Sequence, residues 1–219
     1  MGTIRVTGRG QLSLRPDTTR VTMDLDRAAP VYGEALQQAS EAVEALGSAL
    51  AGLGFARSEL KTLSFGVDTE YESYQEDGVY KSRFAGYRAR HSLKLEFPSD
   101  NDRLDKTLRA LIDSGAKPEL RLSFTVRDPE AAKNALLAKA VEDAREKALV
   151  LSGAAGTALR EIESIDYSWG RVDLEVRPMA DEPLMGALVD GPAAKRLAPD
   201  LEPEDIDVSD AVTVVWKIE

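Results

Sequence analysis

Residues 63–97 read LSFGVDTEYESYQEDGVYKSRFAGYRARHSLKLEF, and this stretch says more about the fold than any other part of the chain. Apolar and polar side chains alternate on both sides of Asp77-Gly78, a dipeptide typical of a tight turn between antiparallel strands. The stretch predicts a long β-hairpin in which residues 68–77 form one arm and residues 79–97 return. About 10 residues per arm would span roughly 33 Å, against roughly 17–20 Å for a typical strand. We therefore expect the tip to project beyond its domain.

Working outward toward the N-terminus, residues 36–53 place leucine and alanine every three or four positions, which predicts an amphipathic helix that ends at Gly54. Before it, residues 21–25 alternate between apolar and polar side chains, as in a strand with one solvated face. Residues 4–14 also alternate, and we expect a pair of strands there.

Gly8 and Gly10 interrupt this first alternation. Because Gly8-Arg9-Gly10 lacks a third glycine and no helix follows it, the segment does not predict a phosphate-binding loop. We expect both glycines to lie at a bulge or turn between the two strands.

The second half of the chain follows a similar pattern. A helix capped by Ser99 and ended by Gly115 precedes a strand over residues 120–126, and Asp128-Pro129 then begins a second long helix. The apolar seam predicted for that helix comprises Leu137, Val141, Ala144, Ala148 and Leu151. Further strands are expected at Ile162, Ile165, Tyr167 and Trp169, at Val172, Leu174 and Val176, and in a closing strand at Val212, Val214, Trp216 and Ile218.

These segments predict an α+β fold, a mostly antiparallel sheet packed by long amphipathic helices. We expect a single domain over residues 1–219 with halves of about 1–98 and 99–219. The strand–helix–strand segments 19–67 and 120–169 resemble each other, which indicates an internal duplication. Residues 178–204 contain half of the ten prolines, and they predict a flexible acidic Pro-rich loop.

The composition excludes several classes of protein. Among 219 residues there are 28 Lys+Arg, 38 Asp+Glu and no cysteine, so the formal net charge is −10. The charge disfavours binding to nucleic acid, and the lack of cysteine excludes disulfides and thiol chemistry. No apolar run reaches the ~18 residues of a spanning helix, so we expect no membrane insertion. Without a signal peptide the sequence as written predicts a cytoplasmic protein, or a periplasmic or secreted one if a leader was removed.

Candidate catalytic and metal-binding residues are sparse. His91 is the only histidine, and we expect it to be an exposed strand residue on the face opposite Leu93 and Leu95, without the partners that catalysis or metal binding requires. Asp24 and Asp26 are expected on a solvated strand face. The loop acids do not follow the spacing of a calcium loop: Glu202, Glu204, Asp205, Asp207 and Asp210. We therefore predict no catalytic, cofactor-binding or metal-binding residues.

The hairpin carries the one surface that stands out. A set of aromatic and basic residues is crowded into it, and these are the residue types enriched at protein interfaces. An arm longer than its sheet also leaves strand edges unpaired, and such edges pair readily with another chain. We predict an oligomer interface at Tyr71, Tyr74, Tyr80, Arg83, Phe84 and Tyr87. The alternative is a twisted hairpin that packs entirely on its own sheet.

Several motifs occur together and in order along nearly the whole chain: Ile4-Arg5-Val6-Thr7-Gly8-Arg9-Gly10, Pro16-Asp17, Gly54 with Leu60-Lys61-Thr62, Gly86-Tyr87-Arg88-Ala89, and the helix from Lys139-Ala140 to Ala144-Arg145-Glu146-Lys147-Ala148. This set resembles the SIMPL-domain family, which is named after a signalling molecule associated with a pelle-like kinase and includes periplasmic immunogenic proteins. The resemblance implies an α+β domain that forms ring-like or channel-like oligomers and has no established catalytic residues. It also implies that an export signal is common among members.

The sequence as a whole predicts a non-enzymatic scaffold or protein-interaction protein that forms a homo-oligomer. One alternative is a small-molecule or lipid-binding module with an apolar pocket lined by Phe65, Phe97 or Trp169. A second alternative is a hydrolase with a pair of buried carboxylates in one cleft.

Overall fold

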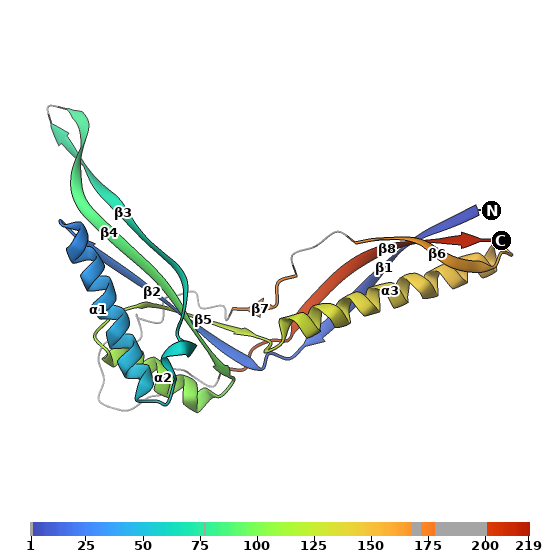
Figure 1. Ribbon diagram of the computed structural model, residues 1–219, viewed down its shortest axis with the longest axis horizontal. Helices are drawn as coiled ribbons and strands as arrows, with labels where there is room; N and C mark the ends of the chain where they lie inside the picture. Colours follow the sequence, from blue (N-terminus) through green and yellow to red (C-terminus); the bar gives the residue numbers. More distant parts are fainter. Residues whose placement is uncertain (1, 77, 168–171, 178–200) are drawn as a thin grey trace. The chain divides into compact units, whose positions relative to one another are not determined.

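The computed structural model describes residues 2–76, 78–167, 172–177 and 201–219. It shows helices packed on antiparallel sheets, which confirms the α+β class (Figure 1). The chain divides into two units. The first comprises Met1–Asp17, Thr125–Val176 and Pro203–Glu219, and the second comprises Thr18–Phe124 and Arg177–Glu202.

The first unit joins the two ends of the chain. Strand β1 (Gly2–Leu14) pairs antiparallel with β8 (Ile206–Ile218) along its whole length, from Gly2 opposite Ile218 to Leu14 opposite Ile206. Strand β6 (Leu159–Asp166) pairs antiparallel with the other edge of β8. The two-residue β7 (Glu175–Val176) also belongs to this unit. Alternate side chains of β1 and β8 are buried, including Val6, Val214 and Trp216.

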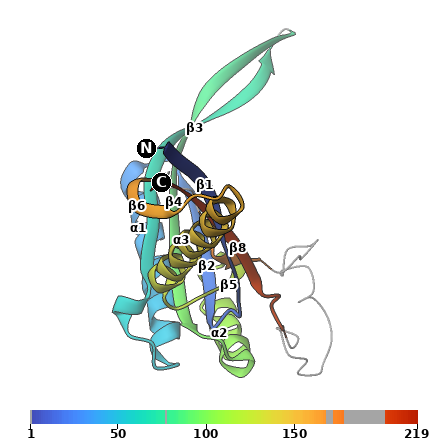
Figure 2. The ribbon, with the colours of Figure 1, turned by 90° about the vertical axis from the view of Figure 1, so that its right-hand side faces the viewer.

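Helix α3 (Pro129–Ala154) packs on the buried face of β1 and β8 (Figure 2). β1 is one continuous strand, so the expected strand pair with a bulge or turn at Gly8 and Gly10 is wrong. A Cβ atom on Gly8 would lie 2.0 Å from the carbonyl oxygen of Ala140, and one on Gly10 would lie 2.1 Å from that of Leu136. The two glycines let the backbones of the strand and the helix meet.

The same close approach corrects the predicted seam of α3. The buried residues are Leu136, Ala140, Ala144, Ala148 and Ser152, spaced by four throughout. Of the predicted seam, Ala144 and Ala148 are buried, whereas Leu137 and Val141 are half-buried and Leu151 is exposed. Over Gly8 the helix presents the small side chains of Ala140 and Ala144, which allow the close approach.

The second unit contains a sheet whose strands follow the order β3–β4–β2–β5. These are β3 (Lys61–Glu76), β4 (Val79–Pro98), β2 (Thr18–Ala29) and β5 (Glu119–Thr125). Helices α1 (Tyr32–Ala51) and α2 (Asn101–Asp113) cover one face of it. The core between sheet and helices comprises Val21, Met23, Leu25, Ala42, Leu46, Leu50, Phe55, Leu93, Leu95, Phe97, Leu104, Leu108, Leu111 and Ala116.

Most of the predicted helix boundaries are confirmed. α1 begins at Tyr32, before the predicted segment 36–53, and ends at Ala51; Gly54 follows it with a φ of +82°. Asp128 caps α3 by accepting a hydrogen bond from the backbone N–H of Ala131 at 2.8 Å. The cap of α2 is Asp100 rather than Ser99, because the Asp100 side chain accepts from the N–H of Arg103. A short 3₁₀ turn, η1 (Arg57–Glu59), leads into β3.

The long hairpin is confirmed. β3 and β4 pair antiparallel from Lys61 opposite Lys94 to Glu76 opposite Val79, and Gly78 adopts a φ of +78°. The pairing of β2 with β4 ends at Ala29 opposite Tyr87, so the hairpin continues beyond β2 as two strands (Figure 1). We call this part the arm: residues 70–76 of β3 with residues 79–86 of β4.

Three expectations about organisation change. The two units do not coincide with the halves 1–98 and 99–219, because the terminal strands pair with each other. The segment 120–169 does not repeat the arrangement of 19–67: β2 and β3 flank β4 in one sheet, whereas β5 and β6 belong to different sheets. The closing strand begins at Ile206 rather than Val212.

Other expectations are only partly covered by the structure. Of residues 172–176, only the last two are a strand, although Leu174 is buried. Trp169 and residues 178–200 of the predicted loop lie outside the described residues. Within the described end of that loop, Leu201 packs against the core of the second unit. Whether the chain behaves as a single domain stays a prediction.

Candidate interaction surface

The two faces of the arm differ in chemistry because side chains alternate along a strand. Tyr71 lies opposite Phe84, Ser73 opposite Ser82, and Gln75 opposite Tyr80, and all of these share one face. We call it the aromatic face. The other face, the charged face, carries Glu72 opposite Arg83, Tyr74 opposite Lys81, and Glu76 opposite Val79. The aromatic face therefore contains no charged residue within the arm.

The aromatic rings form a continuous row. The centroids of Tyr71 and Phe84 are 5.9 Å apart, those of Phe84 and Tyr87 are 5.2 Å apart, and those of Tyr87 and Tyr32 are 5.4 Å apart. All three pairs meet edge to face, the geometry that aromatic rings favour. The row runs from the arm to the first residue of α1.

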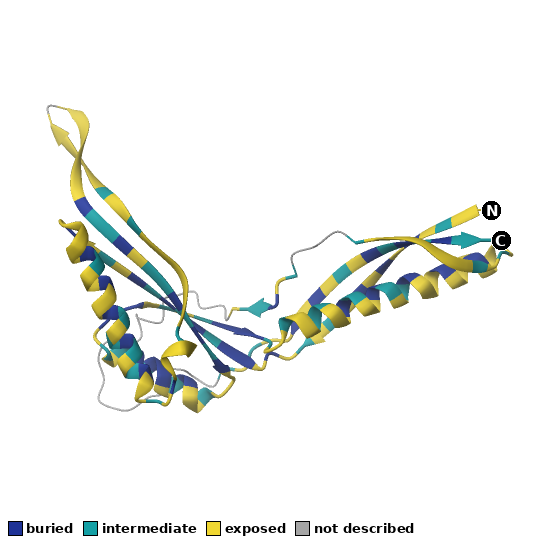
Figure 3. Ribbon diagram, in the orientation of Figure 1, coloured by how far each residue is buried: buried dark blue, intermediate teal, exposed yellow. Residues whose placement is uncertain are grey.

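This aromatic row is largely solvent-exposed. The exposed fraction is 61% for Tyr71, 48% for Phe84 and 49% for Tyr32. Tyr80, near the tip, is 78% exposed. Figure 3 shows the arm as exposed along both of its strands. Monomeric proteins seldom leave contiguous apolar surface of this kind uncovered.

A bulge at Gly86 places the row on one face. Thr69 pairs with Tyr87, Glu70 with Gly86 and Tyr71 with Phe84, so Ala85 is an extra residue in β4. In a regular strand, residues 84 and 87 would point to opposite faces, whereas one extra residue brings them to the same face. Gly86 adopts a φ of +148°, and a Cβ atom there would lie 2.6 Å from the carbonyl oxygen of Ala29. Glycine is required at this position on both grounds.

The charged face is a ladder of ion pairs across the hairpin. Arg83 pairs with Glu72, Lys81 with Glu76 at 2.6 Å, and Arg90 with Asp68 at 2.9 Å. Arg88 joins Glu70 to Asp26, which it contacts at 2.9 Å. The hydrogen bond to Glu70, then that to Asp26, raises the pKa of the Arg88 guanidinium above its ordinary value. The Arg83 guanidinium also lies 5.6 Å from the ring centroid of Tyr74.

The structure thus sorts the six predicted interface residues into two groups. Tyr71, Phe84 and Tyr87 form the aromatic row, and Tyr80 shares their face. Tyr74 and Arg83 belong to the charged face. Sequence reasoning missed Tyr32, because its only signal is a tyrosine at the start of a helix, and its contact with Tyr87 depends on how that helix lies on the sheet.

His91 differs from its prediction. It is half-buried, its Nε2 lies 3.0 Å from the Thr62 hydroxyl, and its ring centroid is 5.1 Å from that of Phe65. It also shares the face of Leu93 rather than the opposite one, because alternate residues of a strand point the same way. Burial lowers the pKa of the His91 imidazole. Thr62 and Phe65 supply neither the orienting acid that a catalytic histidine with a nucleophile requires nor the further ligands that a metal site requires.

Other side chains considered for chemistry have structural partners. Asp24 pairs with Arg121 and Asp26 with Arg88. Asp210 accepts a hydrogen bond from the Tyr167 hydroxyl at 2.9 Å, and this bond is the main cause that raises the pKa of Tyr167. In the described ranges, no group of three or more His, Cys, Asp or Glu residues is arranged to hold a metal ion.

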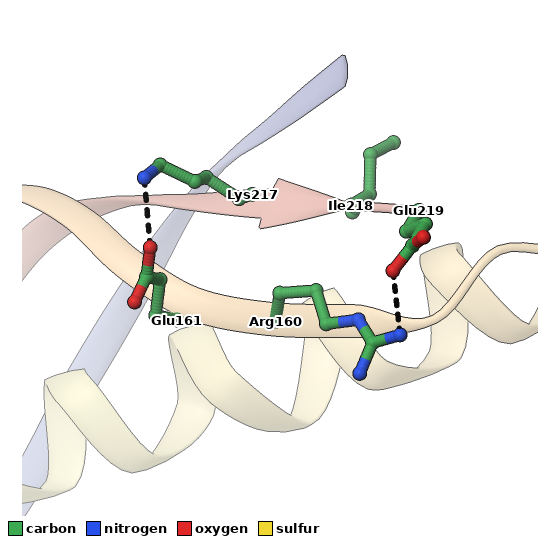
Figure 4. A pocket seen from close by; sticks show the side chains of 5 residues that line it. All are labelled: Arg160, Glu161, Lys217, Ile218 and Glu219. Atoms are coloured by element: carbon green, nitrogen blue, oxygen red, sulfur yellow. Dashed lines mark hydrogen bonds and ion pairs between the residues drawn. The ribbon is translucent and has the colours of Figure 1, made fainter. Parts of the chain in front are cut away.

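The first unit has a pocket of about 280 Å³ at the ends of β6 and β8. Arg160, Glu161, Lys217, Ile218 and Glu219 line it. Its charges pair with one another, Arg160 with Glu219 at 2.6 Å and Lys217 with Glu161 at 2.7 Å (Figure 4). The bond to Glu161 raises the pKa of Lys217, and the same bond lowers that of Glu161. Four such paired groups are a salt-bridged surface rather than an acid–base site.

Of the residues proposed to line an apolar pocket, Trp169 lies outside the described residues, and Phe65 and Phe97 differ in their surroundings. Phe97 is buried, with its ring centroid 5.6 Å from that of Phe55, and the Arg103 guanidinium lies 4.4 Å from the Phe55 centroid. Phe65 is 51% exposed on β3, the outermost strand in its sheet order.

In the described part of the chain, no helix is long and apolar enough to cross a membrane.

Fold and surface together define an α+β protein with helix-covered antiparallel sheets, whose most distinctive surface is an exposed aromatic arm. The model of the family described as "SIMPL: Protein of unknown function (DUF541)" matches residues 4–216. The chain belongs to this family, as its sequence motifs predict.

No curated protein matches the sequence. Among solved structures, the chain is similar to one titled "Structure of CutA from Synechococcus elongatus PCC7942". The match has 14% identity and a TM-score of 0.23, and it covers 58% of this chain and 95% of that one.

Proposed function

We propose that this protein is a non-enzymatic scaffold that assembles with further copies of itself through the arm. The observation that carries the proposal is the exposed aromatic row on an arm that extends beyond β2. A row of Tyr and Phe side chains is the kind of anchor that interfaces bury, and flanking polar groups exclude water and fix orientation.

The electrostatics of the arm support a specific assembly over indiscriminate aggregation. The charged face holds internally matched ion pairs, so a contact between two arms leaves none of these charges unpaired. The net charge of −10 keeps separate molecules apart unless a complementary surface brings them together. Because the chain has no cysteine, the proposed contact is independent of the redox state of its compartment.

The test compares the two faces of the arm by sedimentation velocity over a range of protein concentrations. The variant Tyr71→Ser with Phe84→Ser removes the exposed centre of the aromatic row. The matched control, Tyr74→Ser, removes one aromatic ring from the charged face of the same arm. We expect the parent to be oligomeric, the double variant to dissociate at concentrations where the parent is assembled, and the control to change less. A monomeric parent, or a double variant that assembles as well as the parent, would refute the proposal.

A further inference from the structure

Both long edges of the arm are available to another strand. β3 is the outermost strand in the described sheet order, and β4 loses β2 as a neighbour beyond Tyr87. Each edge therefore presents backbone N–H and C=O groups without a strand partner among the described residues. Such edges are templates for pairing with another chain.

The two edges carry opposite charge. The β3 part of the arm, residues 70–76, contains Glu70, Glu72 and Glu76 and no lysine or arginine. The β4 part, residues 79–86, contains Lys81 and Arg83 and no aspartate or glutamate. These charged side chains share one face of the hairpin. The arm is thus an acidic strand beside a basic strand, each with a free outer edge.

Building on the proposed self-assembly, we propose that the acidic β3 edge of one copy pairs with the basic β4 edge of the next copy, head to tail. When all copies point the same way, β3 is antiparallel to the neighbouring copy's β4, just as it is to its own. Each Glu72 then lies between two Arg83 side chains, and each Tyr71 between two Phe84 rings. Opposite charges in facing positions stabilise neighbouring strands, and like charges destabilise them.

A two-fold symmetric contact is the main competitor, and the charges oppose it. Pairing of β3 with a second β3 would set Glu70, Glu72 and Glu76 against the same acidic row. Pairing of β4 with a second β4 would set Lys81 and Arg83 against a basic row. The head-to-tail contact is heterologous, so it leaves a free acidic edge and a free basic edge after two copies have joined.

A charge-swapped arm tests this polarity without breaking the ion pairs inside each arm. The swapped variant combines Glu72→Arg, Glu76→Lys, Lys81→Glu and Arg83→Glu, so each cross-strand pair is kept with its signs reversed. Swapped and parent chains, distinguished by mass labelling, are mixed under dissociating conditions, returned to assembly conditions and analysed by native mass spectrometry. Circular dichroism checks that the swapped chain is folded.

We expect each chain to assemble with its own kind and mixed assemblies to fall about tenfold below their statistical share, since every mixed junction faces like charges. Statistical mixing, preferential mixed assembly, or a folded swapped chain that fails to assemble would overturn the head-to-tail pairing while leaving the proposed self-assembly in place. A monomeric parent would overturn both.

Cysteine cross-linking gives a second measurement that leaves the charges unchanged. The chain has no cysteine, and Ser73 on β3 faces Ser82 on β4 across the hairpin. Facing residues on antiparallel strands have Cα separations of about 4.5–5.5 Å, which suits a disulfide. We expect Ser73→Cys chains alone and Ser82→Cys chains alone to form no covalent dimer, and their mixture to form one under oxidation. Covalent dimers of the Ser73→Cys chain alone, or none in the mixture, would contradict the pairing.

Discussion

Gly8 is the position at which a single methyl group should do most damage to the first unit. An alanine Cβ there would lie 2.0 Å from the Ala140 carbonyl oxygen, 2.3 Å from the Ala144 nitrogen and 2.7 Å from the Ala144 Cβ. Ordinary contact begins at 3.4 Å, and two of these three atoms are helix backbone that no rotamer change can move. The helix must therefore retreat from β1 by more than 1 Å.

The loss of unfolding free energy follows from the contacts between α3 and the sheet that this movement weakens. Ala140, Ala144 and Ala148 are fully buried against β1 and β8. A radial gap of about 0.5–1 Å already forfeits about a quarter to a half of each dispersion contact. Overpacking a core typically lowers the free energy of unfolding by about 1–3 kcal/mol. Because the overlap at Gly8 is with helix backbone, we expect Gly8→Ala to lower it by about 3 kcal/mol or more.

The assay is chemical denaturation of Gly8→Ala beside the control Gly66→Ala. Gly66 also lies within a strand, but a Cβ there meets nothing within 4 Å. We expect the control to be unchanged or slightly stabilised by loss of glycine's backbone entropy, by about 0.5–1 kcal/mol. A Gly8→Ala protein as stable as the control would show that α3 does not lie on β1 as described.

Three further predictions follow from local contacts. Gly86→Ala should remove the bulge, turn Phe84 away from Tyr87 and raise the concentration needed for assembly; sedimentation that matches the parent would refute this. Asp100→Ala should cost about 1 kcal/mol of unfolding free energy, because it removes the cap of α2. Because burial lowers the folded-state pKa of His91, the unfolded chain binds the proton more readily, and stability should fall as the pH drops below about 6.5, the unfolded value. Denaturation at pH 7.5 and 5.5 should show a smaller loss for His91→Gln, and an equal loss in both proteins would contradict the assignment.

The hairpin was predictable because its signals are local. Asp77-Gly78 marks the turn, and the alternation on either side marks the strands. The same holds for the cap at Asp128 and the stop at Gly54, where one or two neighbouring residues decide the conformation.

The remaining features depend on partners distant in the sequence. The role of Gly8 becomes visible only when Ala140 and Ala144 lie above it, and the pairing of β1 with β8 joins opposite ends of the chain. Simple alternation also misjudges the faces of the arm, because the bulge at Gly86 shifts the pattern by one residue. Composition alone predicts Tyr74 and Phe84 in one interface, whereas the strand register places them on opposite faces of the arm.

Replacing residues 72–84 by a two-residue Asn-Gly turn tests the central claim most directly. The shortened hairpin keeps the sheet beneath α1 and α2 and removes most of the arm, including Phe84 and the charged pairs Glu72–Arg83 and Glu76–Lys81. Multi-angle light scattering at tens of micromolar should give the parent a mass several times its 23.8 kDa chain, and the trimmed protein a lower mass with the same circular dichroism. A parent that is already monomeric, or a trimmed protein of unchanged oligomeric state, would contradict assembly through the arm.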